Sequence, residues 1–241
     1  LRLSRGLGDV YKRQIINEAN KNLYEGASEE EIKEALILSS RSLVEAEPNY
    51  TYATSRILLD GLRTEALSFL EIAPNATHEE MEKLYPKTLD AYINKAIALE
   101  LINPELGKMD LKKLGKNLKP ERDLMFSYLG LQTLYDRYFI HKDETRFELP
   151  QIFFMRVAMG LAIGEEKRED RAIEFYNLLS SFNYMSSTPT LFNSGTIHSQ
   201  LSSCYLTTVP DDLKGIYDAL GDNAMLSKWA GGLGNDWTPV R

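Results

Sequence analysis

The sequence contains very little cysteine: Cys204 is the one thiol among 241 residues. A single cysteine excludes a disulfide framework and a cysteine-based zinc site within the chain, and we predict no metal site of its own. Long apolar runs are also absent, since no stretch approaches the roughly 18 to 20 residues that a bilayer-spanning helix needs. We therefore expect no membrane partner, and the cysteine usage fits a cytoplasmic location.

Basic residues are fewer than acidic ones: 28 Lys and Arg stand against 35 Asp and Glu, and the formal net charge is -7. Binding to a nucleic-acid polymer needs a clustered basic face, so we expect no such partner. A polyphosphate ligand stays open, because a few local donors suffice for one. With 43% hydrophobic and 26% charged residues, the chain has the composition of a folded protein with one or two domains.

Helix signals dominate the first two thirds of the chain. Ser28 is followed three residues later by Glu31, the pair that forms a capping box. Thr77 and Glu80 repeat the box, although Pro86 could kink or break the helix that they open. We expect further helices over residues 50–70, 122–136, 151–163, 168–182 and 211–229, a loop with one short helix over 103–120, and a short hairpin over 137–149. The side chains expected in the core from the 168–182 helix are Ile173, Leu178 and Leu179.

The first fourteen residues differ from the rest of the chain. They are basic and show no clear helical face. One interpretation is a targeting segment, although it has no continuous apolar core of the kind that secretory signals carry. The other is an extension that is not native to the protein.

The chemistry-bearing residues lie after position 185. Residues 186–210 are rich in Ser, Thr, Pro and Gly, a composition typical of strands and tight loops. Cys204 stands there on a short apolar segment, where a lone cysteine is either a small buried hydrophobe or a functional thiol that needs a second thiol or a base. His198 is the closest histidine, as a catalytic partner or as a surface turn residue. A glycine run at 231–234 would allow a close backbone approach to a phosphate or sugar, or form a plain turn.

Four motifs in a fixed order resemble the large subunit of class I ribonucleotide reductases. They are Ser187-Thr-Pro-Thr190, Asn193-Ser-Gly-Thr196, Gln200-Leu-Ser-Ser-Cys204 and the run from Gly231 to Arg241, Gly-Gly-Leu-Gly-Asn-Asp-Trp-Thr-Pro-Val-Arg. Upstream, Glu47-Pro-Asn-Tyr50 resembles the end of the family's ATP-cone domain, and Asp123-Leu-Met-Phe-Ser-Tyr128 resembles the opening of its helical domain.

The resemblance implies a mainly α N-terminal part, made of a partial ATP cone and a helical domain. This part leads into the first strands of a ten-stranded α/β barrel that the chain is expected to leave truncated. We divide the chain into an odd leader over 1–14, a partial ATP cone over 15–70, the helical domain over 71–185 and the start of the barrel over 186–241. We also expect the region after Tyr184 to be poorly stable in isolation, because barrel strands without neighbours expose their edges.

The family reduces ribonucleoside diphosphates to deoxyribonucleoside diphosphates by thiyl-radical chemistry, with a redox-active cysteine pair as the source of electrons. Cys204 matches the first cysteine of that pair, and Thr190, Ser203, Cys204 and Gly232 match substrate contacts. The second cysteine and the radical cysteine would follow Arg241, so the resemblance implies that residues 1–241 are inactive alone.

Regulation and partners are implied in the same way. Asp211, Asp212, Leu213 and Arg241 match the allosteric site for the specificity nucleotide, although a plain Asp N-cap also explains Asp211, Asp212 and Leu213 without any ligand. Ser28 falls where the family has a hydroxyl near the activity nucleotide of the cone. The implied effectors are ATP, dATP, dTTP and dGTP. The implied partners are a small (beta) subunit whose metal cofactor generates the radical, thioredoxin or glutaredoxin as reductant, and a second copy in a homodimer.

Two alternatives stay open. The cobalamin-dependent class II reductases share the Ser-Thr-Pro-Thr and Ser-Ser-Cys motifs. A non-catalytic helical module that senses nucleotides would also agree with a single cysteine.

Overall fold

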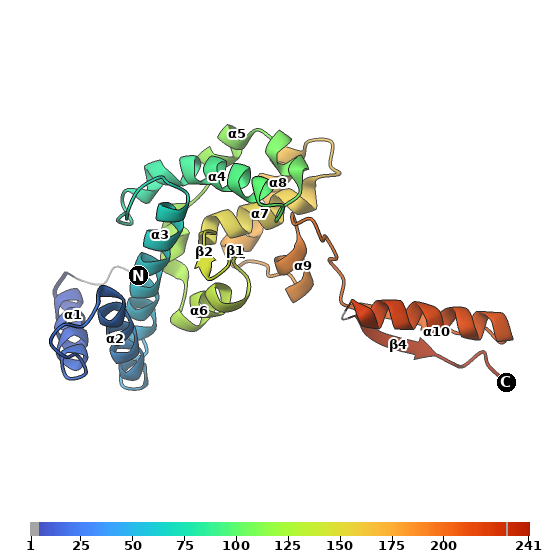
Figure 1. Cartoon of the computed structure of the whole chain (residues 1–241), viewed down its shortest axis with the longest axis horizontal. Coiled ribbons are helices and arrows are strands. Elements are labelled where there is room, and N and C mark those ends of the chain that lie inside the picture. The colour runs from blue at the N-terminus through green and yellow to red at the C-terminus, as the bar shows by residue number, and fades with distance from the viewer. Residues whose placement is uncertain (1–4, 230) are drawn as a thin grey trace.

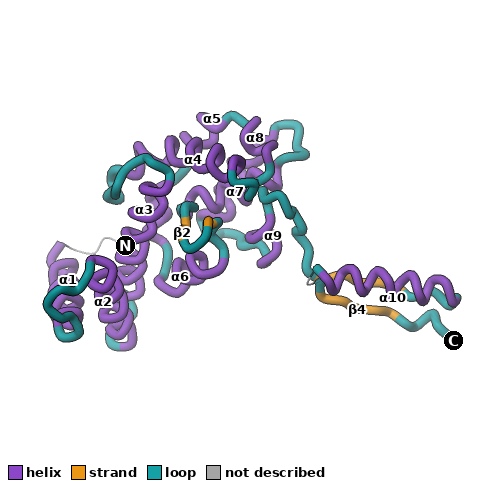
Figure 2. The backbone as a smooth tube through the Cα atoms, viewed as in Figure 1, coloured by secondary structure: helices purple, strands orange, loops and turns teal. Residues whose placement is uncertain are grey.

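A computed structural model describes residues 5–229 and 231–241, and it shows two regions (Figure 1). We call residues 5–201 the body and residues 202–241 the arm. The body is helical, and the arm projects from it as a helix lying along two strands (Figure 2). The elements of the body are α1 (Arg5–Asn20), α2 (Glu29–Ser42), η1 (Leu43–Glu45), α3 (Tyr50–Phe69), α4 (Met81–Ala98), η2 (Pro104–Lys108), α5 (Leu111–Lys116), η3 (Pro120–Met125), α6 (Tyr128–Arg137), β1 (His141–Lys142), β2 (Thr145–Arg146), α7 (Pro150–Ala162), α8 (Arg168–Ser180) and α9 (Thr188–Asn193).

Capping residues fix the helix starts that the sequence predicts. Ser28 and Glu31 form the capping box at α2: the Glu31 amide donates to Ser28 Oγ, and the Ser28 amide donates to the Glu31 carboxylate. Thr77 and Glu80 exchange the same two bonds before α4. Pro150 stands at the first turn of α7, where its missing N–H costs nothing. The predicted hairpin is confirmed by the antiparallel pair β1 and β2.

Pro86 does not break α4, which runs unbroken from Met81 to Ala98. The proline packs against α5 at Gly115, where a Cβ would lie 3.0 Å from the Pro86 Cα. The absence of a side chain at Gly115 therefore lets α5 pack closely against α4 at the proline.

The loop with a short helix that we predict over residues 103–120 is confirmed by α5, which follows the 3-10 helix η2. Two other local predictions are wrong. Residues 122–136 are not one helix, because Phe126 is buried in extended conformation and Ser127 caps a new helix. Leu178 is 44% exposed rather than part of the core. Each outcome depends on tertiary packing that local spacing does not encode.

The segment expected to lack a helical face is helical where the structure describes it. Residues 5–14 belong to α1, while residues 1–4 lie outside the described part. Ile15 and Ala19 of this helix are buried, and the rings of Tyr11 and Tyr50 meet edge to face at 4.6 Å. This region therefore packs on the first turn of α3.

The hydrophobic core belongs to the body. The buried cluster begins at Leu58 in α3, ends at Leu191 in α9 and centres on α7. Nearly every residue of α7 is buried, including Arg156. Residues 186–210 were expected to form strands and loops, but their first part is the short helix α9, anchored to the core by Leu191.

The arm is a β-α-β unit. Its elements are β3 (Cys204–Thr208), α10 (Leu213–Lys228) and β4 (Gly232–Asp236), and β3 pairs in parallel with β4. The predicted strand around Cys204 and the predicted capped helix after Asp211 are both confirmed. Among the described helices, none is long and apolar enough to cross a membrane.

Candidate functional site on the arm

Cys204 is the first residue of β3, and its side chain is exposed. The interpretation of this cysteine as a small buried hydrophobe is therefore wrong for the structure as it stands. Ser203 Oγ lies 3.7 Å from Cys204 Sγ, within reach of a weak hydrogen bond to sulfur. The thiol is thus placed at a strand end, beside a hydroxyl and open to a ligand.

Gly232 stands directly across from Cys204. The parallel register pairs the two residues, and the Gly232 amide donates to the Ser203 carbonyl at 2.5 Å. A Cβ at position 232 would lie 3.7 Å from Cys204 Sγ and 3.2 Å from the Ser203 oxygen. Glycine therefore keeps the space beside the thiol clear, which is the close approach that the glycine run suggested.

Thr190 reaches this strand from the body. It lies on α9, half-buried, and its hydroxyl donates to the Leu201 carbonyl at 3.3 Å. Asn193, one turn further on, donates to the Gln200 carbonyl at 2.7 Å. These two bonds tie α9 to the segment that becomes β3. Three of the predicted substrate contacts, Ser203, Cys204 and Gly232, are thus neighbours, and Thr190 is tethered to the segment that leads into β3.

A second cluster gathers at the other end of the arm. Arg241 Nε lies 2.5 Å from Asp211 Oδ2, and the Arg241 amide donates to the same carboxylate at 3.3 Å. Asp212 caps α10 by accepting from the Gly215 amide at 2.9 Å, and Leu213 is 73% exposed. The four residues predicted for an effector site are therefore adjacent, although Asp212 acts here as a plain N-cap.

The remaining candidates stay apart from the arm. The Ser28 hydroxyl accepts a hydrogen bond in the capping box of α2. This helix lies across the body from the arm (Figure 1). His198 is exposed on the loop between α9 and β3. Within residues 5–229 and 231–241, no three His, Cys, Asp or Glu side chains converge as a metal site would require.

Sequence reasoning missed a buried ion pair behind α9. Arg156 Nε lies 2.7 Å from Glu148 Oε1, and both side chains are fully buried. Burial by itself would lower the pKa of Arg156, but the charge of Glu148 and the hydrogen bonds to it outweigh burial and raise that pKa. An arginine within the otherwise apolar stretch of α7 is the signal in the sequence that could have revealed this pair.

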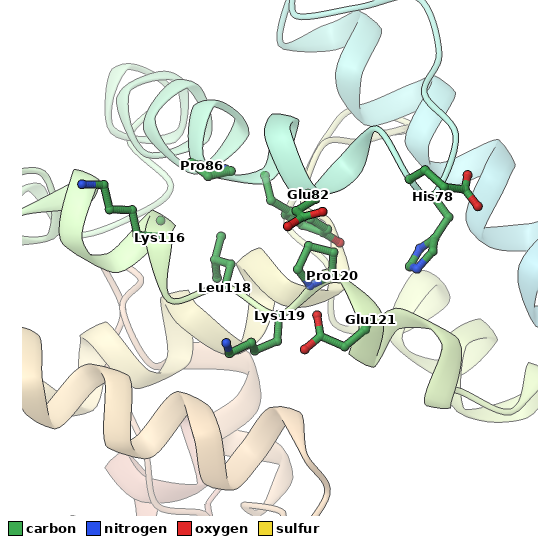
Figure 3. Close-up of a pocket in the computed structure, with 11 residues that line it drawn as sticks. His78, Glu82, Pro86, Lys116, Leu118, Lys119, Pro120 and Glu121 are labelled. Carbon is green, nitrogen blue, oxygen red and sulfur yellow. The ribbon is translucent and has the colours of Figure 1, made fainter. Parts of the chain in front are cut away.

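The body carries a separate groove of about 660 Å³ between α4 and the segment from α5 to η3 (Figure 3). His78 lies at one side, and its pKa is lowered by burial and by the nearby Arg63. Charges of both signs line the groove, with Glu79, Glu82 and Glu121 on one hand and Lys116 and Lys119 on the other. The lining therefore selects neither an anion nor a cation.

Comparisons with known proteins agree with this architecture. A family model described as the ribonucleotide reductase all-alpha domain matches residues 124–199, and a second, the ribonucleotide reductase barrel domain, matches residues 202–241. The second match coincides with the arm. The chain belongs to the family of ribonucleotide reductase large subunits.

Among its relatives, the chain is 51% identical over 228 residues to a protein of Chlamydia muridarum named ribonucleoside-diphosphate reductase subunit alpha. It is 35% identical over 238 residues to the protein of the same name from Helicobacter pylori. It is 31% identical over 243 residues to the ribonucleoside-diphosphate reductase large subunit of vaccinia virus. These matches cover 94%, 98% and 95% of the chain. The chain spans between 21% and 28% of the length of the curated relatives.

Proposed function

We propose that the full-length protein containing this sequence reduces ribonucleoside diphosphates to deoxyribonucleoside diphosphates. The observation that carries the proposal is the exposed thiol of Cys204 at the head of β3, with Gly232 opposite it and Ser203 beside it. A strand end that presents a thiol next to bare backbone suits a ribose whose 2'-hydroxyl must approach within hydrogen-bonding distance of the sulfur.

The thiol is one half of the reductant in this proposal. The ribose loses its 2'-hydroxyl as water and gains a hydrogen in its place. The two electrons come from two cysteine thiols, which become a disulfide. Cys204 is the first of these thiols, and a second cysteine beyond residue 241 is the other. A thiol is required at position 204 because a hydroxyl cannot form the disulfide.

The neighbouring residues bind and orient the ribose. Ser203 offers a hydroxyl beside the thiol, and Thr190 offers one from α9. The absence of a side chain at position 232 leaves the backbone there open to a close approach of the ribose. Each of these roles stays a prediction until substrate binding is measured.

Effector binding is proposed at the N-terminal end of α10. Amides at a helix N-terminus attract phosphate oxygens, and Arg241 adds a positive charge beside Asp211. The Arg241 side chain is 90% exposed despite its ion pair, so donors of its guanidinium remain accessible to a phosphate. The specificity nucleotides dTTP, dGTP, dATP and ATP are the expected ligands. Binding of an activity nucleotide near Ser28 stays a prediction.

The names of the relatives favour a two-subunit enzyme. They describe a subunit alpha or a large subunit, which implies a small radical-generating partner and argues against the cobalamin-dependent class. Reduction of the disulfide by thioredoxin or glutaredoxin, a homodimer and a cytoplasmic location remain predictions. The non-catalytic alternative is less favoured, because a sensing module needs no exposed thiol beside Gly232.

The test is deoxyribonucleotide formation by the full-length protein with its small subunit and a dithiol reductant. We expect Cys204→Ser to abolish turnover while the melting temperature stays within a few degrees, since serine is close in size to cysteine and a substitution at an exposed position changes stability by about 0.5 kcal/mol or less. Thr208→Ser, on the same strand, is the matched control and should leave turnover unchanged. Turnover of Cys204→Ser within about tenfold of the native value, about 1.4 kcal/mol in barrier, would remove this cysteine from the mechanism.

A further inference from the structure

We propose that Arg156 is a positioning residue that holds α9, and through it Thr190 and the start of β3, in the geometry that the substrate requires. The inference rests on the proposed function for its consequences in catalysis. Its structural basis is independent of that function, because it consists of contacts among buried groups of the body.

Arg156 connects the core to the end of α9. Its guanidinium forms a fork with Glu148, with Nε to Oε1 at 2.7 Å and Nη2 to Oε2 at 3.2 Å. On its other side, Nη1 donates to the Ser194 carbonyl at 2.6 Å and lies 3.4 Å from the Leu191 and Phe192 carbonyls. The last carbonyls of a helix have no partner within the helix, so a buried cation at the C-terminus of α9 satisfies them directly.

Glu148 is itself fixed on two further sides. Its Oε1 accepts from Tyr92 Oη at 2.5 Å, and its Oε2 accepts from the Ile140 amide at 3.0 Å. Tyr92 belongs to α4 and is fully buried. Glu148, which binds the Arg156 guanidinium, is thus held by Tyr92 and by the Ile140 amide. These bonds limit the movement of the ion pair.

The turn after α9 also packs against α7, the helix that carries Arg156. Ser194 Oγ donates to the Val157 carbonyl at 2.7 Å, and the Asn103 amide donates to the Gly195 carbonyl at 2.9 Å. A Cβ at Gly160 would overlap the Gly195 nitrogen, and one at Gly195 would lie 2.8 Å from the Arg156 carbonyl oxygen. Gly195 also has φ +78°, which a side chain rarely adopts. The motif Asn193-Ser-Gly-Thr196 therefore docks α9 rather than forming an ordinary surface turn.

Hydrogen bonds connect α9 to the segment that leads to the Cys204 thiol. Thr190 and Asn193 bond the carbonyls of Leu201 and Gln200, three and four residues before Cys204. A buried ion pair is weak evidence for stability, because well-packed apolar residues often replace one at no cost. Fixing a specific geometry is a better explanation of why two charges are buried here, behind the helix α9 that bonds the segment before Cys204.

The test compares variants of the full-length protein by two measurements. Glu148→Gln with Arg156→Met removes both charges, so that no lone buried charge remains. The exposed pair of Arg171 with Glu174 on α8 supplies the matched control, Arg171→Lys. CDP binding is measured at equilibrium without the small subunit, and hydrogen exchange is followed along the chain by mass spectrometry.

We expect CDP binding to weaken at least tenfold, about 1.4 kcal/mol, in the double variant. Exchange should accelerate at least tenfold in residues 188–201 but not in α3 or α4, whereas a merely structural loss would accelerate exchange throughout the body. Unchanged CDP affinity together with unchanged exchange in residues 188–201 would overturn the inference. If the double variant does not fold, Arg156→Lys decides, because it keeps the charge and loses the fork: native affinity and exchange in that variant would likewise overturn it.

Failure of the proposed function would appear differently. If the unaltered protein does not bind CDP, or if Cys204→Ser keeps its turnover, the reductase assignment of the site fails. The exchange measurement still decides whether Arg156 holds α9 in that case.

Discussion

The body and the arm differ in where their apolar residues lie. The body buries a continuous core from Leu58 to Leu191. In the arm, the buried hydrophobic residues among those described are Val209 and Ala219. Large apolar side chains of the arm are exposed instead, namely Leu206, Leu213, Tyr217, Leu220, Met225, Trp229, Leu233 and Trp237. The contrast indicates that stability resides in the body, while the arm carries the proposed chemistry on a sheet with two open edges.

The largest expected effect comes from replacing one leucine in each region by alanine. Leu67→Ala in α3 should lower the free energy of unfolding by about 2 to 5 kcal/mol, because the side chain is fully buried. Leu206→Ala in β3 should change it by less than about 0.5 kcal/mol, because that side chain is 90% exposed. Urea unfolding of the 241-residue chain, followed by circular dichroism, gives both values. Similar losses for the two variants would show that the arm is packed in solution.

A second, smaller effect concerns a buried acid of the body. Burial raises the pKa of Asp123 from 3.8 to about 6. Between about pH 4 and pH 6 the folded chain keeps a proton that the unfolded chain has lost, so the free energy of unfolding falls as the pH rises through this window. Two pKa units correspond to about 2 to 3 kcal/mol. Asp123→Asn should abolish this part of the pH dependence in urea unfolding between pH 4 and pH 7.

The arm offers a control of opposite sign. The Thr238 hydroxyl and amide lower the pKa of Asp236, so any stability from this carboxylate is present above about pH 4 and is lost as the pH falls. Asp236 is exposed, and Asp236→Asn should leave the curve between pH 4 and pH 7 unchanged. Parallel curves for native protein and Asp123→Asn would contradict the burial of a protonated Asp123.

The smallest expected effect is the removal of the arm. A chain of residues 1–201 should melt within a few degrees of the 241-residue chain, a difference of about 1 kcal/mol or less, and should aggregate less. A chain that ends at residue 182 should be less stable than residues 1–201, because it loses Leu191 from the core and the carbonyls that Arg156 binds. Scanning calorimetry and light scattering compare the three. Equal melting of residues 1–182 and 1–201 would show that α9 contributes no stability.

The domain boundaries remain predictions, and the contrast between body and arm bears on one of them. The sequence places the start of the barrel at residue 186. The packing of α9 against α7 leads us to propose a division near residue 201 instead, with α9 as the last element of the body.

Local signals in the sequence predicted those elements whose ends are fixed by a few neighbouring residues. Ser28 and Pro150 marked the starts of α2 and α7, and the bonds between Thr77 and Glu80 mark the turn that precedes α4 at Met81, because each of these features depends on residues within one turn. The sequence did not predict the break between helices at Phe126, and it did not predict the helix α9. Both depend on what the residues contact: Phe126 packs against the rings of Phe154 and Phe182.

The candidate site shows the same division. The strand at Cys204 and the close approach at Gly232 could be expected from residue types and spacing, with the resemblance to known reductases supplying their roles. The ion pair between Asp211 and Arg241 joins residues thirty positions apart, and the bonds from Arg156 to the carbonyls at the end of α9 join residues 35 to 38 positions apart. No local pattern specifies such contacts, because they arise from the arrangement of whole elements in space.

The exposed Cys204 also makes the chain a specific target for chemical labelling. It is the one thiol in 241 residues, so a maleimide dye or a nitroxide would attach at a single position without prior mutagenesis. The label would sit opposite Gly232 at the root of the arm. Its rotational mobility in the 241-residue chain would report directly how firmly the arm is held to the body.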